Sequence, residues 1–221
     1  MTKIPQIQFT HPNSPVSGCD MLKLDPNTSY GNLTSKTADI SVRLKKVNKD
    51  LKHLYEKPYQ IDSPPLPAGT VNPENFFTPI EVELIVYNIR VATDQLICLL
   101  YILNYNNTNN SFPEQIKIDS IGKYLSPKIT DGKQYLSEFD HFKNFLQTLN
   151  NISNAYKHSF LNSDTMSLRG KSEPVVFALG LKANNITNSP TPYSITLSDV
   201  VIQFDEMYQK ILEELKKFIT Y

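Results

Sequence analysis

The sequence lacks the short motifs by which the common nucleotide-binding and hydrolytic folds are recognised. Its seven glycines form no phosphate-binding loop and no Gly-x-Ser-x-Gly elbow. His-Glu-x-x-His and Cys-x-x-Cys are missing too: the two cysteines, Cys19 and Cys98, lie far apart, and His11, His53 and His141 fall in separate patterns. These absences argue against the classical nucleotide folds and the metal hydrolases, and we predict neither a cofactor nor a metal site.

An excess of charge of one sign is also missing. Lys plus Arg and Asp plus Glu number 22 each, so no net field attracts the chain to nucleic acid or acidic lipid. The longest apolar run, Leu96–Leu103, is far shorter than the roughly 20 residues that span a bilayer. The N-terminal residues are interrupted by prolines and contain no signal-peptide core. We therefore expect a cytoplasmic protein without membrane contact.

Hydrophobic periodicity predicts a mainly α-helical domain that follows an irregular arm. Residues 1–35 are rich in Pro, Ser, Asn and Thr, and they are predicted to form the arm, with a short extended piece at Ile4–Phe9. Residues 36–221 are predicted to form a single domain, in which 58–77 is a proline-rich connection. Steps of three and four between apolar residues predict the main helices, which run from Ala38 to Pro58, from 79 to 104, from Ser137 or Asp140 to 160–162, and from 199 to 219.

The second of these helices has the clearest start signal. Thr78 is predicted to cap it, with Pro79 at its first position and Glu81 completing a capping box. Toward its end this helix is apolar on nearly all sides, which indicates a central position covered by several neighbours. The polar residues 104–111 are predicted to form a turn, and a short helix is expected at 116–124.

Residues 174–197 are predicted to form a β-hairpin. Pro174–Leu181 is short and rich in β-branched and aromatic residues, and Tyr193–Leu197 alternates like a returning strand. Ser198 is then predicted to cap the last helix. The second and third helices are expected to pack antiparallel, joined by the excursion between them.

The candidate site consists of polar residues on these two inner helices. Arg90 and Asp94 share one helix face, and so do Asn154 and His158, with Lys157 beside them. His158 can act as a general acid or base when Asp94 orients it, while Lys157 or Arg90 stabilises an anion. The alternative is an ion-pair network that fixes the register of the helices.

Three segments, IRVATDQLICLLYIL (89–103), SFPEQIKI (111–118) and LQTLNNISNAYKHS (146–159), resemble a set of uncharacterised bacterial helical proteins that are similar to the HEPN superfamily. The matching positions are Arg90, Asp94, Leu96, Phe112, Pro113, Asn154, Lys157 and His158. The resemblance implies an antiparallel HEPN-like bundle of four main helices with a small β-hairpin before the C-terminal helix. It also implies a homodimer and an Arg-x4-6-His ribonuclease motif near the dimer interface. His158 matches the histidine of that motif, whereas Asn151, Ile152 and Ser153 stand where its arginine would be, so the motif is degenerate.

Three functions follow, and the first is ranked highest. One is a non-catalytic module that binds RNA, a nucleotide or a protein. Another is a metal-independent ribonuclease of toxin or phage-defence type, in which His158 is the acid/base, Asp94 orients it, and Asn154 and Lys157 hold the phosphate. That enzyme would use the RNA 2′-hydroxyl as nucleophile and leave DNA intact. The third is a scaffold that recruits another protein through the basic face of its first helix or through the proline-rich connection.

Overall fold

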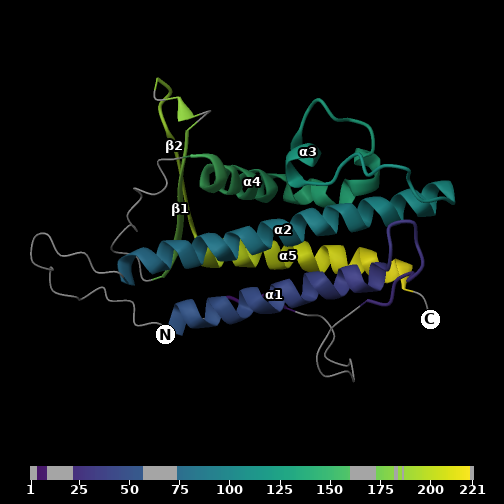
Figure 1. Ribbon diagram of the computed structural model, residues 1–221, viewed down its shortest axis with the longest axis horizontal. Helices are drawn as coiled ribbons and strands as arrows, with labels where there is room; N and C mark the ends of the chain where they lie inside the picture. Colours follow the sequence, from purple (N-terminus) through teal and green to yellow (C-terminus); the bar gives the residue numbers. More distant parts are fainter. Residues whose placement is uncertain are drawn as a thin grey trace, which may run out of the picture.

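The structure is a computed structural model that describes residues 4–8, 22–56, 74–159, 173–181, 184–185 and 187–219, with the backbone alone at 74–79. It is mainly α-helical, with a small two-stranded antiparallel sheet directly before the last long helix, as the sequence predicts. The longest helix, α2 (Glu74–Asn109), runs through the centre of the molecule in Figure 1, between α1 (Leu33–Glu56) and α4 (Lys143–His158). The remaining long helix, α5 (Leu197–Leu215), lies beside α2 and packs on it.

Helix α1 begins five residues earlier than the predicted start at Ala38, inside the stretch assigned to the arm. Its first turn is capped by Asn32, whose side-chain oxygen accepts the N–H of Ser35 at 3.0 Å. That turn has only Leu33 as an apolar residue, so periodicity alone does not reveal it. The predicted apolar stripe is buried against α2 from there on, and it consists of Ile40, Leu44, Val47, Leu51 and Leu54. The helix ends at Glu56, and Pro58 lies outside the described residues.

Helix α2 is longer than predicted at both ends. It begins at Glu74, so the predicted capping box at Thr78, Pro79 and Glu81 is wrong, and the last residues of the 58–77 connection are helical. Pro79 is the sixth residue of the observed helix rather than its first, so the Thr-Pro pair does not mark where this helix begins.

The predicted turn at 104–111 is also wrong, because α2 continues to Asn109. Tyr105 stacks on Tyr101 with ring centroids 6.2 Å apart and packs on Tyr135 at 5.2 Å. This packing holds the polar end of the helix in place despite its composition. Asn110 ends it in a left-handed conformation (φ 53°), and its N–H donates to the carbonyl of Asn106.

Within the part of the chain that the structure describes, Ile80–Asn109 is the one helical segment long and apolar enough to cross a membrane by length and composition. However, 67% of the most apolar window of this segment is buried inside the protein. Such burial is what a central helix covered by α1, α4 and α5 shows.

The excursion between α2 and α4 contains a short helix, α3 (Ile121–Leu125), and a kinked 3₁₀ segment, Lys133–Phe142. The short helix was predicted at 116–124, and the third main helix was expected to start at Ser137 or Asp140. Instead, Leu136 leaves helical geometry (φ −133°, ψ 24°) and regular α4 begins only at Lys143. Gly132 opens the segment at φ 92°, where an added Cβ would lie 2.7 Å from the Tyr101 ring.

The predicted hairpin is confirmed as β1 (Val175–Gly180) paired antiparallel with β2 (Thr191–Thr196). Its inner residues Val176 and Ala178 are buried, and β1 packs along α4. The cap of α5 is Thr196 rather than the predicted Ser198: the Thr196 hydroxyl accepts the N–H of Asp199 at 3.1 Å. The helix gives way at Lys216 to one turn of 3₁₀ helix, short of the predicted end at 219.

Candidate functional site

Arg90 joins α2 to α4. Its side chain is almost fully buried, and its Nε lies 3.2 and 3.0 Å from the two carboxylate oxygens of Asp94, one turn along α2. Its Nη1 donates to the side-chain oxygen of Asn150 on α4 at 2.8 Å. The bond to Asp94 stays within α2, whereas the bond to Asn150 crosses to α4, so a different register of the two helices would leave the Nη1 donor without this partner.

Asp94 is held by two partners, neither of which is His158. Besides Arg90, its Oδ1 accepts the backbone N–H of Ile121 at 2.8 Å, and so Asp94 ties the first residue of α3 to α2. One turn further, the thiol of Cys98 donates to the carbonyl of Asp119 at 3.4 Å. Burial, together with the charges of Asp119 and Asp94, raises the pKa of Cys98 to about 11. The predicted pair Arg90 and Asp94 therefore belongs to a structural junction between α2, α3 and α4.

His158 lies away from this junction, at the C-terminal end of α4. It is eight residues beyond Asn150, which at 1.5 Å per residue is about 12 Å along the helix axis. Because α4 runs antiparallel to α2, Asp94 lies on the other side of Arg90, in the opposite direction. The structure therefore does not bring Asp94 and His158 together, and the imidazole of His158 is exposed. The backbone carbonyl of His158 accepts a hydrogen bond from the Asn184 side chain at 2.7 Å.

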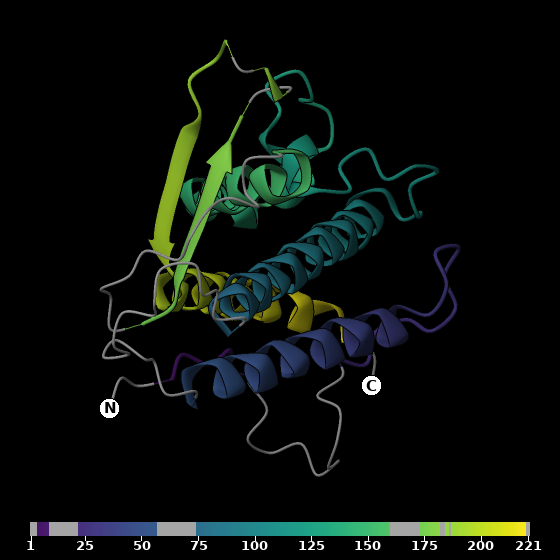
Figure 2. The same cartoon turned by 60° about the vertical axis from the view of Figure 1, so that its left-hand side comes forward.

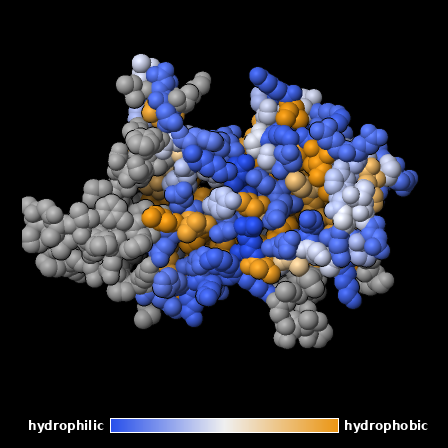
Figure 3. Space-filling model, viewed as in Figure 1, coloured by the Kyte–Doolittle hydropathy of each residue, from blue (hydrophilic) through white to orange (hydrophobic). Residues whose placement is uncertain are grey.

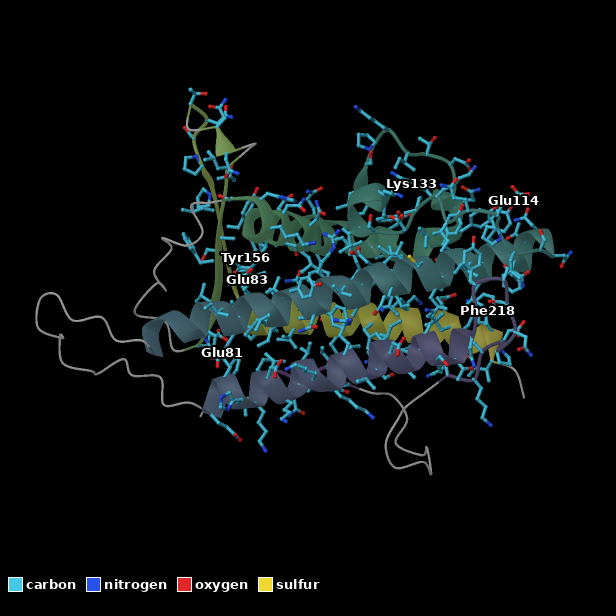
Figure 4. The ribbon with its side chains drawn as sticks, in the orientation of Figure 1. Glu81, Glu83, Glu114, Lys133, Tyr156 and Phe218 are labelled. Carbon is cyan, nitrogen blue, oxygen red and sulfur yellow. The ribbon has the colours of Figure 1, made fainter. Side chains whose placement is uncertain are left out.

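Lys157 and Asn154 share the exposed end of α4 with His158. The ammonium of Lys157 lies 5.9 Å from the ring centre of Tyr87 on α2, a distance at which the cation and the ring attract each other. The neighbouring Tyr156 points inward and donates to the carbonyl of Phe177 at 3.2 Å. Burial and the nearby charge of Glu83 raise the pKa of Tyr156, and Figure 4 shows these two labelled residues side by side between α4 and α2.

The structure reveals a surface that the sequence did not predict, on the N-terminal half of α2. Ile80, Leu84 and Tyr87 are 53%, 52% and 47% exposed, and their spacing of four and three places them on one face. We call these three residues the α2 stripe. Figure 3 shows hydrophobic residues along the middle of the drawn face, where α2 runs between α1 and α4.

The apolar residues toward the end of α2 are buried by several neighbours, as the sequence predicts, whereas this face of its N-terminal half is open. The spacing of the three residues is visible in the sequence. Buried residues of the same helix show the same periodicity, however, and so the spacing alone does not show which face remains open.

The part of the chain that the structure describes brings no three His, Cys, Asp or Glu side chains together as a metal-binding group, and His11 and Cys19 lie outside that part. The α2 stripe, the adjoining α4 end and the buried Arg90 junction are therefore the features from which a function has to be argued. The chain matches no protein-family model, and comparisons with curated proteins and with solved structures gave no match either.

Proposed function

We propose that this chain is a non-catalytic binding module on a HEPN-like helical scaffold, and that its docking face consists of the α2 stripe and the exposed end of α4. The observation that carries the proposal is the stripe itself. Single exposed apolar residues are ordinary, whereas three large ones in a row beside a polar rim are typical of a protein-binding surface. Lys157, Asn154 and His158 supply that rim.

The chemistry of this face favours a protein over a nucleic acid. Of the three stripe residues only Tyr87 offers a base a stacking surface, since Ile80 and Leu84 are aliphatic, and the exposed Glu83 between them repels phosphate. The spacing Ile80, Leu84, Tyr87 is that of a helix face that packs against another helix. The ligand class supported best is therefore an amphipathic helix with apolar residues at the same spacing.

The face is also complementary to itself, so a second copy of the chain is the first partner to test. If two α2 helices pair antiparallel about a two-fold axis between Glu83 and Leu84, Tyr87 of one copy lies opposite Ile80 of the other. Lys157, which lies over Tyr87, is then one turn from the partner's Glu83. Partial desolvation raises the pKa of the Glu83 carboxyl, so a cation brought to it would stabilise its charged form.

Sedimentation velocity of the purified chain tests this pairing. We expect the wild type to be a dimer at micromolar concentration and Leu84→Asp to be a folded monomer, because the substitution puts a charge into the middle of the stripe. Val42→Asp is the matched control: Val42 is 56% exposed on α1, outside the stripe, and the substitution should leave the dimer intact. A wild type that stays monomeric at all concentrations, or two variants with equal effects, would contradict the pairing.

The ribonuclease remains the second candidate, supported by the exposed imidazole of His158 beside Lys157 and Asn154. Incubating wild type and His158→Ala with mixed single-stranded RNA in EDTA separates it from the binding module. We expect both proteins to leave the RNA intact. RNA cleavage that is lost in the variant would replace our proposal with a metal-independent ribonuclease.

A further inference from the structure

Residues 4–8 lie as an extended segment between α1 and α5. Figure 2 shows the N-terminal purple segment in this position, and α1 packs on α2 while approaching α5 little, so the segment fills the space between them. Its side chains alternate: Pro5 and Ile7 are buried, and Gln6 and Gln8 are exposed. Ile7 is 2% exposed and belongs to the hydrophobic core.

The two helices hold this segment by its backbone. The N–H of Ile7 donates to the Asn48 side-chain oxygen at 2.9 Å, and the Asn48 amide donates back to the carbonyl of Ile7 at 2.8 Å. On the other side, the N–H of Gln8 donates to Asp205 at 2.7 Å, and the Gln209 amide donates to the carbonyl of Gln8 at 2.7 Å. Side chains of α1 and α5 thus make the bonds that neighbouring strands would make in a sheet.

These contacts set few demands on the sequence of the bound segment. Each hydrogen bond goes to a backbone group that almost any residue has, and the apolar side chains at two alternate positions are what the space between the helices selects. Asp205 and Gln209 are also fixed relative to each other, because the Gln209 amide donates to Asp205 at 3.1 Å. This bond restrains the two side chains that hold Gln8, and such a restraint lowers the entropy cost of binding a segment.

We infer that the space between α1 and α5 is a peptide-binding groove, and that residues 4–8 occupy it in the absence of a partner. The partner that fits is an extended segment with apolar residues at alternate positions and no demand on the residue between them. It would replace residues 4–8 and release the N-terminus of the chain. The groove uses residues other than those of the α2 stripe, so this inference does not depend on the proposed function.

Residues 4–8 belong to the same chain as the groove, and this covalent link determines how strongly they compete with a free peptide. A segment on the same chain competes at an effective concentration on the order of millimolar. A free peptide of the same sequence should therefore bind the wild-type chain weakly, and it should bind well once residues 4–8 are displaced.

Fluorescence anisotropy with a labelled peptide of residues 1–9, MTKIPQIQF, tests this on the full-length chain. Ile7→Asp places a charge in the buried position and should displace the resident segment while leaving the groove intact. We expect this variant to bind the peptide at least about tenfold more tightly than the wild type does. Gln6→Asp is the matched control, because Gln6 is exposed one residue away and its replacement should leave the segment bound.

Two further variants keep the test decisive. Gln8→Pro removes the N–H that donates to Asp205 and puts a ring carbon in its place, without adding a buried charge. It serves as a second way to displace the segment if Ile7→Asp does not fold. Adding Asn48→Ala to either displacing variant should abolish peptide binding, because the groove loses both bonds to Ile7. A folded displacing variant that binds the peptide no better than the wild type, or that binds it equally well without Asn48, would overturn the inference.

Discussion

Arg90 on α2 donates a hydrogen bond to the side-chain oxygen of Asn150 on α4 at 2.8 Å, and this bond sets the register between the two helices. The other side of the same guanidinium holds Asp94, which in turn holds the first residue of α3. Arg90 and Asp94, which the sequence suggested as part of a reaction site, therefore join α2, α3 and α4. The proposed docking face, the outer face of α2 and the end of α4, lies outside this junction.

Replacing Arg90 should destabilise the fold strongly. Arg90→Ala removes the guanidinium from the Asp94 carboxylate, whose side chain is 27% exposed and which keeps the Ile121 N–H, and from the Asn150 oxygen. Because Asp94 keeps some contact with solvent, we expect a loss of about 2–4 kcal/mol in the free energy of unfolding, somewhat less than the roughly 3–5 kcal/mol of a fully buried broken pair. Urea unfolding at neutral pH measures it, with Lys46→Ala as the control, since the exposed Lys46–Asp50 pair should contribute under about 1 kcal/mol. Equal losses in the two variants would contradict this account of the junction.

Tyr124 and Asp140 give a prediction for acidic pH. The buried Tyr124 hydroxyl donates to Asp140 at 2.7 Å. Hydrogen bonds from Lys143 and then from Tyr124 hold the pKa of Asp140 below its usual value. Stability from a lowered carboxyl pKa is present above the unfolded pKa of about 3.9 and is lost as pH falls through the folded value.

We therefore expect Tyr124→Phe to cost about 1 kcal/mol at pH 7 and less below about pH 4. Urea unfolding of both proteins from pH 7 to pH 2 measures the difference. Asp140 is half exposed, so solvent screening keeps the change small. A difference that stays constant or grows on acidification would show that the bond to Asp140 is not its source.

The thiol of Cys98 should react slowly with disulfide reagents in the folded protein. Its pKa of about 11, raised first by burial, leaves little thiolate at pH 8. In a Cys19→Ser background, we expect the native thiol to react with a disulfide reagent roughly 100-fold more slowly than the urea-unfolded chain. Asp119→Asn should speed the native reaction, because the charge of Asp119 helps to raise this pKa. Similar rates in native and unfolded protein would contradict the burial of this thiol.

The proposed pairing of two copies can be tested by reversing the charges of Glu83 and Lys157, singly and together. Glu83→Lys and Lys157→Glu should each weaken self-association, since each places like charges opposite one another across the two-fold axis. The double variant restores opposite charges and should recover most of the affinity. Sedimentation equilibrium compares the four proteins. A double variant no better than the weaker single variant would place Glu83 and Lys157 apart in the dimer.

The helices and the hairpin were predictable because burial of one face imposes a period that the residues display. Leu44 and Val47 on α1 and Phe145 and Leu149 on α4 are buried as their spacing indicates. The C-terminal end of α2 could not be predicted in this way. Its Asn-rich last turns are held by the packing of Tyr105 on Tyr135, a residue distant in sequence.

The candidate site was predictable only in part. The pairing of Arg90 with Asp94 follows from helical spacing alone. Their further partners, Asn150 and Ile121, come from other segments that only the folded chain brings near. The exposure of Leu84 was hidden because a leucine on an open helix face and a leucine in the core follow the same period.

Photo-crosslinking reports directly whether the α2 stripe meets a second copy of the chain. A benzophenone amino acid placed at position 84, within the stripe, is irradiated in the purified full-length chain, and the same residue at position 42 on α1 is the control. We expect a covalent dimer from position 84 and none from position 42, with the crosslink mapped near Glu83 of the second copy. A chain that remains monomeric after irradiation at position 84, or that crosslinks equally from both positions, would contradict it.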